Sequence, residues 1–189
     1  MRVAVAVGLL ALAPARAFAE ADVAPPPPPA WSTLGPRNAV TTAPLAFLAR
    51  GAALSYERLV TPRVSVVALG GYRSAALGDY ASTTWTGGVE ARVWVRWPRT
   101  AVAMSGPYLG LHVSVGYTQL TDRTTATRVG SSWGLSERLD FGWRFVALGH
   151  LAVAPWVGLG LREDVDGRGR LATTARVAGA FGFDVGWMF

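Results

Sequence analysis

Residues 85–97 read WTGGVEARVWVRW, and their side chains alternate between two kinds along the whole stretch. The residues of one parity, from Trp85 to Trp97, are apolar or small, whereas the other parity includes Glu90 and Arg92. A period of two is typical of a β-strand that has one apolar and one polar face. The segment therefore predicts a strand whose two faces meet different surroundings.

Two tryptophans border the apolar face of this strand, twelve residues apart. At ~3.3 Å per residue and a tilt of ~45°, that separation projects to roughly 28 Å along a membrane normal. Barrels of the outer membrane carry an apolar band ~25 Å tall between two rims of aromatic side chains. The same spacing recurs between Trp133 and Phe145 and predicts an aromatic girdle. We expect this girdle to comprise Trp85, Trp97, Trp133, Trp143, Phe145 and Trp187.

The composition agrees with a wall that faces lipid and excludes several classes of protein. The chain has 189 residues, of which 51% are hydrophobic and only 16% are charged, and all 18 basic residues are arginine. The absence of Cys excludes disulfides, thiolate metal sites, a catalytic cysteine and a lipoprotein anchor. No apolar run after the N-terminal segment approaches the ~20 residues of a membrane helix. The net charge is +6, and it falls to +4 without the two arginines of residues 1–19, which is too mild and too scattered to indicate nucleic-acid binding.

The sequence predicts three parts along the chain. Residues 1–19 are expected to be a signal peptide, because an arginine precedes an apolar run that ends in the small-residue pattern Ala17-Phe18-Ala19. Residues 20–37 form a Pro-rich periplasmic segment, in which five consecutive prolines favour an extended tether. Residues 38–189 carry the period-two pattern and are expected to form the barrel.

Segments of alternating hydrophobicity recur along residues 38–189 and predict eight strands. These strands are 38–47, 51–60, 63–77, 84–97, 107–121, 131–145, 150–162 and 171–189. The expected fold is all-β, an eight-stranded antiparallel up-and-down transmembrane β-barrel in the bacterial outer membrane. Because the number of strands is even, the N-terminus and the C-terminus of the barrel are both expected on the periplasmic side.

Residues 181–189 carry the most specific pattern in the chain. The alternating apolar side chains of one parity are Phe181, Phe183, Val185, Trp187 and Phe189. This ending resembles the C-terminal signature that outer-membrane barrels present to their assembly machinery. With the strand pattern, it makes residues 38–189 similar to the small eight-stranded outer-membrane barrels of the OmpA-like or OmpX-like superfamily. The resemblance implies a filled cylinder with mobile outer loops, and roles that range from anchoring and adhesion to lipid modification.

The polar parity predicts a charged barrel interior, the lumen. It collects seven arginines and four acids, namely Glu57, Arg73, Glu90, Arg92, Arg96, Arg138, Asp140, Arg144, Arg162, Arg176 and Asp184. An eight-stranded barrel is just wide enough for side chains to fill it, so buried charges there must be paired. We therefore expect a salt-bridge network that closes the lumen. The arginine excess leaves a narrow anion-preferring pore as an alternative. Glu137 is an exception, because its parity faces outward.

Three short motifs resemble functional sites without completing them. Residues 130–134 fit G-x-S-x-G but open a strand, whereas that motif needs a strand–turn–helix elbow. The segment that begins at Asp164 resembles a calcium loop but lacks its final glutamate. His112 and Ser114 share one strand face and resemble the H-x-S pair of lipid A deacylases, although Val115 stands where that family has Asn. We assign no catalytic residue, with His112 and Ser114 as the alternative, and we predict no metal and no cofactor.

These patterns predict a structural or surface-interaction role in the outer membrane. The expected partners are outer-membrane lipid, lipopolysaccharide and the barrel assembly machinery, but no nucleic acid. Arginines of the predicted outer loops are placed to contact lipopolysaccharide phosphates, namely Arg123, Arg128, Arg162, Arg168 and Arg170. A barrel enzyme acting on lipid A or phospholipid and the narrow pore are alternatives. A soluble lipocalin-like barrel, with its apolar face inward, is a further one.

Overall fold

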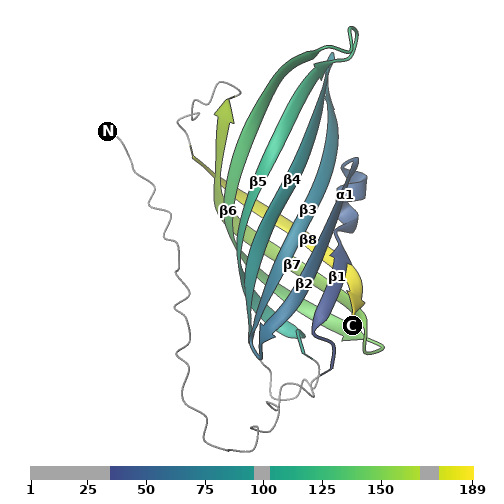
Figure 1. Ribbon diagram of the computed structural model, residues 1–189, viewed down its shortest axis with the longest axis vertical. Coiled ribbons are helices and arrows are strands. Elements are labelled where there is room, and N and C mark those ends of the chain that lie inside the picture. The colour runs from purple at the N-terminus through teal and green to yellow at the C-terminus, as the bar shows by residue number, and fades with distance from the viewer. Residues whose placement is uncertain (1–34, 96–102, 167–174) are drawn as a thin grey trace, which may run out of the picture.

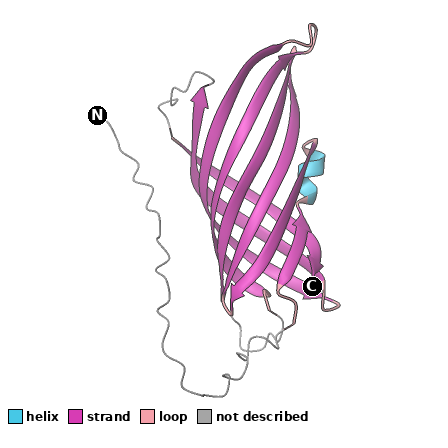
Figure 2. Ribbon diagram, viewed as in Figure 1, coloured by secondary structure: helices cyan, strands magenta, loops and turns pink. Residues whose placement is uncertain are grey.

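The computed structural model describes residues 35–95, 103–166 and 175–189, which form an all-β structure (Figure 1). Eight antiparallel strands are hydrogen-bonded in a ring in the order of the sequence. Figure 2 shows that strands make up nearly all of the described chain. The expected order of eight up-and-down strands is therefore confirmed. The elements are β1 (Asn38–Thr42), α1 (Pro44–Leu48), β2 (Gly51–Thr61), β3 (Val64–Leu77), β4 (Tyr80–Trp94), β5 (Gly106–Asp122), β6 (Arg128–Ala147), β7 (Leu151–Asp166) and β8 (Arg176–Met188).

The ring closes between its first and last strands over only a short distance. Residues 39–42 of β1 pair with residues 185–188 of β8, and the N–H of Asn38 donates to the carbonyl of Phe189 at 2.9 Å. The start of β1 and the end of β8 therefore lie side by side at one end of the ring (Figure 1). We call this end the closed end and the opposite end the open end.

The first strand is shorter than predicted. The sequence predicts a strand over 38–47, but β1 ends at Thr42 and Pro44 begins α1. Proline has no N–H for a sheet ladder, yet it fits the first turn of a helix. As a result, β8 has no β1 partner before Val185, and α1 lies beside β2 and β8 instead. Within the described ranges, no helix combines the length and the apolar character needed to cross a membrane.

Several strands extend further toward the open end than predicted. β4 begins at Tyr80 rather than at 84, and β7 continues to Asp166 rather than ending at 162. A tight turn at Gly78, which has φ +62°, joins β3 to β4. Many of the added residues are polar, so hydrophobic alternation does not mark them even though backbone pairing continues. Residues 171–174 of the predicted last strand lie outside the described residues.

Apolar side chains cover the outer wall, and charged side chains fill the interior. Val93 and Leu111 are 51% and 59% exposed, whereas Arg92 and Asp140 are 4% and 2% exposed. Glu137 is exposed on the outer wall, as its parity predicts. A soluble lipocalin-like barrel has the reverse arrangement, with its apolar face around a ligand. The structure does not support that alternative.

Glycines make room for the charged interior. Arg92, Gly110, Asp140 and Gly158 lie opposite one another in a row across β4, β5, β6 and β7. A Cβ atom at Gly110 would overlap the carboxylate of Glu90, and a Cβ atom at Gly158 would overlap that of Asp140. Large and small interior residues thus alternate around the ring, which lets a narrow barrel hold long side chains.

Candidate functional site

A layer of apolar and aromatic side chains fills the closed end of the barrel. It contains Leu59, Trp94, Met104, Tyr108 and Met188, all of which are buried. The rings of Trp94 and Tyr108 lie 4.9 Å apart, at the adjacent ends of β4 and β5. We call this layer the floor, because the charged groups of the interior lie directly above it.

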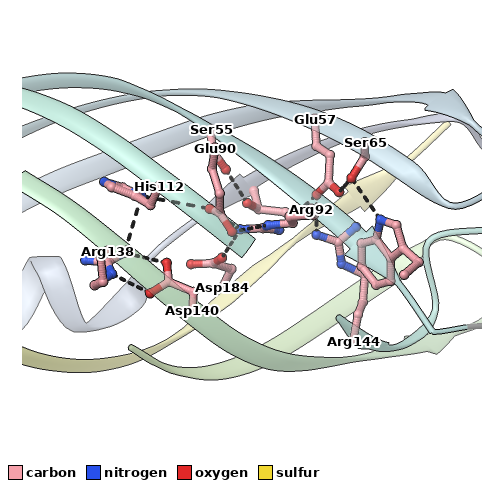
Figure 3. Close-up of polar contacts among 12 residues, drawn as sticks. Ser55, Glu57, Ser65, Glu90, Arg92, His112, Arg138, Asp140, Arg144 and Asp184 are labelled. Carbon is pink, nitrogen blue, oxygen red and sulfur yellow. Dashed lines mark hydrogen bonds and ion pairs between the residues drawn. The ribbon is translucent and has the colours of Figure 1, made fainter. Parts of the chain in front are cut away.

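Glu57 is the centre of the first charged group (Figure 3). A guanidinium N–H of Arg92 donates to Glu57 Oε2 at 3.0 Å, and Arg144 donates to the same oxygen. The Ser65 hydroxyl donates to Glu57 Oε1 and accepts the indole N–H of Trp94 at 2.8 Å. Both carboxylate oxygens of Glu57 are therefore hydrogen-bonded, as the burial of this group requires.

Arg92 links Glu57 to two further carboxylates. Its Nε and Nη2 donate to the two oxygens of Glu90 at 2.7 and 2.9 Å, the fork geometry that guanidinium groups favour. The Oδ2 atom of Asp184 lies 3.7 Å from Nη2. Because the three acids come from β2, β4 and β8, one guanidinium connects strands from different parts of the ring.

Arg138 forms a second fork on β6. Its Nε and Nη2 donate to the two oxygens of Asp140, the latter at 2.8 Å. Nη2 also lies 3.4 Å from Nδ1 of His112, and the same ring nitrogen lies 3.9 Å from Glu90. His112 thus stands between the Arg92–Glu90 fork and the Arg138–Asp140 fork (Figure 3).

Each arginine of the network also lies over an aromatic ring. Arg92 lies 4.6 Å from the ring centre of Tyr108, Arg138 lies 4.5 Å from that of Trp156, and Arg144 lies 4.9 Å from that of Trp94. A flat guanidinium can stack on a ring and still donate in its own plane, which an ammonium group cannot do. This geometry favours arginine over lysine at these three positions.

The buried network is smaller than the set predicted from parity. It contains Glu57, Glu90, Arg92, Arg138, Asp140, Arg144 and Asp184. Three predicted members do not join it: Arg73 and Arg176 are exposed, and Arg162 is exposed and pairs with Asp164 at 3.1 Å. All three lie toward the open end, where the extended strands leave the interior accessible to solvent. Arg96 lies outside the described residues.

This distribution changes the charge balance inferred from the sequence. The predicted set has seven arginines and four acids, whereas the buried network has three arginines and four acids. Among the described residues, the predicted arginines outside the network therefore lie toward the open end, and the charge of the network does not favour anions. Sequence analysis also missed Ser65, Trp94, Tyr108 and Trp156 as network partners. Their alternation predicts that these side chains face inward, but they are uncharged, so the search for charged interior residues did not select them.

A cavity of about 270 Å³ lies on the open-end side of these salt bridges. All eight strands and α1 contribute to its lining. Small and apolar side chains of α1, β2 and β3 line one side, among them Ala46, Ala53 and Leu69. Charged and aromatic residues line the other side, and they include His112, Arg138, Asp140, Trp156 and Asp184.

The geometry around His112 and Ser114 does not assemble a catalytic group. Both side chains face inward from β5 and are buried, and no hydrogen bond joins them in the described part of the chain. Glu90, His112 and Asp140 place potential ligand atoms within 4.8 Å of one another. However, both oxygens of each carboxylate already accept the fork of an arginine. A cation would have to displace two guanidinium groups, so this set does not favour a metal.

Aromatic side chains form rows on the outer wall near both ends of the ring. Toward the open end, Trp85 and Trp133 are joined by two residues outside the predicted girdle, because Tyr72, Trp85, Tyr117 and Trp133 lie opposite one another across β3 to β6. Their neighbouring rings lie 4.8–6.1 Å apart. Toward the closed end, the exposed predicted members are Trp143, Phe145 and Trp187. Trp97 lies outside the described residues.

The apolar alternation at the end of β8 also faces the outer wall. Phe181, Trp187 and Phe189 are exposed, and Phe183 and Val185 are half-buried. Comparison of the chain with models of known families, with curated proteins and with solved structures gave no match.

Proposed function

We propose that this chain is a small outer-membrane β-barrel protein of the OmpA-like or OmpX-like kind, with a structural or surface-interaction role. One observation carries the proposal: apolar side chains cover the outside of an eight-stranded ring whose inside is charged. Exposure of this apolar outer wall to water would be unfavourable, whereas contact with the hydrocarbon of a bilayer would be favourable. The closed end, where the first strand begins and the last strand ends, then faces the periplasm.

The interior supports a structural role rather than conduction. The floor and the Glu57 group fill the lumen at the closed end with buried side chains. Each carboxylate of the Glu57, Glu90 and Asp140 groups is fully engaged with arginine or hydroxyl donors. Ions would have to separate these pairs to pass. The network is therefore proposed to stiffen the cylinder and to leave interaction to the open end.

The membrane assignment predicts a specific behaviour on fractionation and on gels. The full chain expressed in a Gram-negative host is expected in the outer-membrane fraction, because its outer wall is apolar between the two aromatic rows. The unboiled protein is expected to migrate differently from the boiled protein in SDS, since folded small barrels resist the detergent. Recovery in the soluble fraction with identical migration before and after boiling would contradict the assignment.

Arginines at the open end support contact with lipopolysaccharide. Arg128 lies 5.8 Å from the ring centre of Tyr117 and donates to its hydroxyl, so its charge is held at the aromatic row. Arg123, in the β5–β6 turn, donates to the carbonyl of Gly78 at 3.3 Å. Both residues are exposed, and phosphate groups of lipopolysaccharide would lie at the same level as this rim in the proposed orientation.

A double substitution tests this contact. Replacing Arg123 and Arg128 with alanine is expected to weaken binding of the purified barrel to lipopolysaccharide roughly thirtyfold, since each surface arginine contributes ~1 kcal/mol at an anionic membrane. The matched control is Arg63→Ala, which removes an exposed arginine from the β2–β3 turn at the closed end. Equal affinities of the double variant, the control and the parent would remove lipopolysaccharide as a partner of this rim.

A further inference from the structure

The cavity above the salt bridges combines an apolar side with a charged side. Its apolar lining comes from Ala46 of α1, Ala53 of β2, and Val67 and Leu69 of β3. The charged lining includes Asp184 of β8 together with Arg138 and Asp140 of β6, and Arg73 of β3 also lines the cavity. A molecule that has an apolar body and one polar end matches this division, because each part would meet a surface of its own kind.

Asp184 has the weakest compensation among the acids of the network. Glu57, Glu90 and Asp140 each accept short hydrogen bonds from an arginine. The nearest cation to Asp184 is Nη2 of Arg92 at 3.7 Å, and that nitrogen already donates to Glu90 at 2.9 Å. Among the described residues, the network thus holds four carboxylates and three guanidinium groups, and Asp184, the acid with the longest arginine contact, lines the cavity.

The volume of the cavity limits the size of the occupant. Ligand pockets for drug-sized molecules usually measure ~300–1,000 Å³, so about 270 Å³ suits a smaller molecule. A phospholipid or a lipid A molecule is far larger than this. Beside the cavity, β1 ends at Thr42, and α1 rather than a strand lies between β2 and β8.

We propose that the cavity binds a small organic amine, whose ammonium group pairs with Asp184 and whose apolar body packs against Ala53, Val67 and Leu69. The ammonium supplies the positive charge that the network lacks, and the apolar body fills space that water would occupy unfavourably. This site concerns the interior of the ring, so it does not depend on the proposed membrane location. The fractionation experiment above tests that location separately.

An isosteric series tests the charge requirement. Binding of 2-phenylethylamine, 2-phenylethanol and phenylacetate to the folded full chain is measured by calorimetry in zwitterionic micelles, with protein-free micelles subtracted. We expect the amine to bind at least about tenfold more tightly than the alcohol, and the carboxylate to bind more weakly still, because a charge-assisted hydrogen bond at a buried acid discriminates by this much. Equal or tighter binding of the alcohol or the carboxylate would overturn the proposal.

Two variants locate the site. Asp184→Asn keeps the shape of the side chain and is expected to bring the affinity for the amine to within about threefold of that for the alcohol. Ala53→Phe fills the cavity from β2 and is expected to abolish binding of all three compounds. Asp164→Asn is the matched control, because this exposed carboxylate lies outside the cavity and its loss should leave binding unchanged.

Far-UV circular dichroism in the same micelles shows which variants are folded, whatever the outcome of the fractionation experiment. A folded Asp184→Asn protein that retains the full preference for the amine would overturn the assignment to Asp184. A folded Ala53→Phe protein that still binds the amine would overturn the assignment to the cavity. If Asp184→Asn does not fold, the Ala53→Phe result and the preference series of the parent chain still decide the proposal.

Discussion

Replacing Arg92 with methionine is expected to lower the free energy of unfolding by about 3–5 kcal/mol, because it leaves buried carboxylates without their cation. Arg92 donates to Glu57 and Glu90 and lies beside Asp184, so three acids lose compensation at once. Glu57 keeps Arg144, but Glu90 keeps only His112 at 3.9 Å. Urea unfolding of the refolded barrel in lipid vesicles, followed by tryptophan fluorescence, measures the change.

Arg162→Met is the matched control for this experiment. Arg162 has the same inward parity and also pairs with an acid two residues along its strand, but its side chain is 56% exposed. Exposed ion pairs contribute at most ~1 kcal/mol, so the control is expected to change stability little. Similar losses in the two variants would show that burial does not determine the role of Arg92.

Gly142→Ala is expected to destabilise the barrel by about 1–3 kcal/mol, since it overfills a packed interior. Gly142 lies directly opposite Tyr108 in the β5–β6 pair. A Cβ atom there would come within 2.6 Å of Cε1 of the Tyr108 ring, which is 1% exposed. The ring cannot move away easily, because Trp94 and the guanidinium of Arg92 pack against it.

The control for Gly142→Ala is Gly87→Ala on the outer parity of β4. A Cβ atom at Gly87 would meet no atom within 4 Å, so this substitution is expected to be neutral or slightly stabilising. The two variants are compared by the midpoint of urea unfolding. A neutral result for Gly142→Ala would mean that Tyr108 has room to shift, and that the fit at the floor is looser than described.

The side on which each residue lies follows from the sequence, because the side chains of a strand alternate strictly. Arg92 and Val93 are neighbours in the chain, and the structure places them on opposite faces of the wall. The pairing of the charges does not follow in this way. Glu57 meets Arg92 and Arg144 across 35 and 87 residues, and only the register between strands decides those contacts. The sequence indicates which side chains of a strand face inward. It does not indicate the register between strands, and therefore not the height of each residue along the barrel axis.

The height of a residue along the barrel also explains one of the two main corrections, the smaller size of the buried network. Arg162 and Arg176 have the same parity as Arg138, but they lie opposite each other near the open end, where the interior is solvent-accessible. Parity alone cannot separate them from the buried arginines. The shortening of β1 has a local origin, because Pro44 has no N–H to donate to the sheet. Hydrophobic alternation does not reveal the absence of this donor.

The four residue pairs between β1 and β8 have a consequence for the order of folding. Every other pair of neighbours is consecutive in the chain, so its loop closes at a small entropic cost, whereas β1 and β8 are separated by almost the whole domain. We therefore expect the seven hairpin contacts to form first, as a curved sheet with two free edges. The seam between β1 and β8 would then close last and, being short, would also be the first to part when the barrel unfolds.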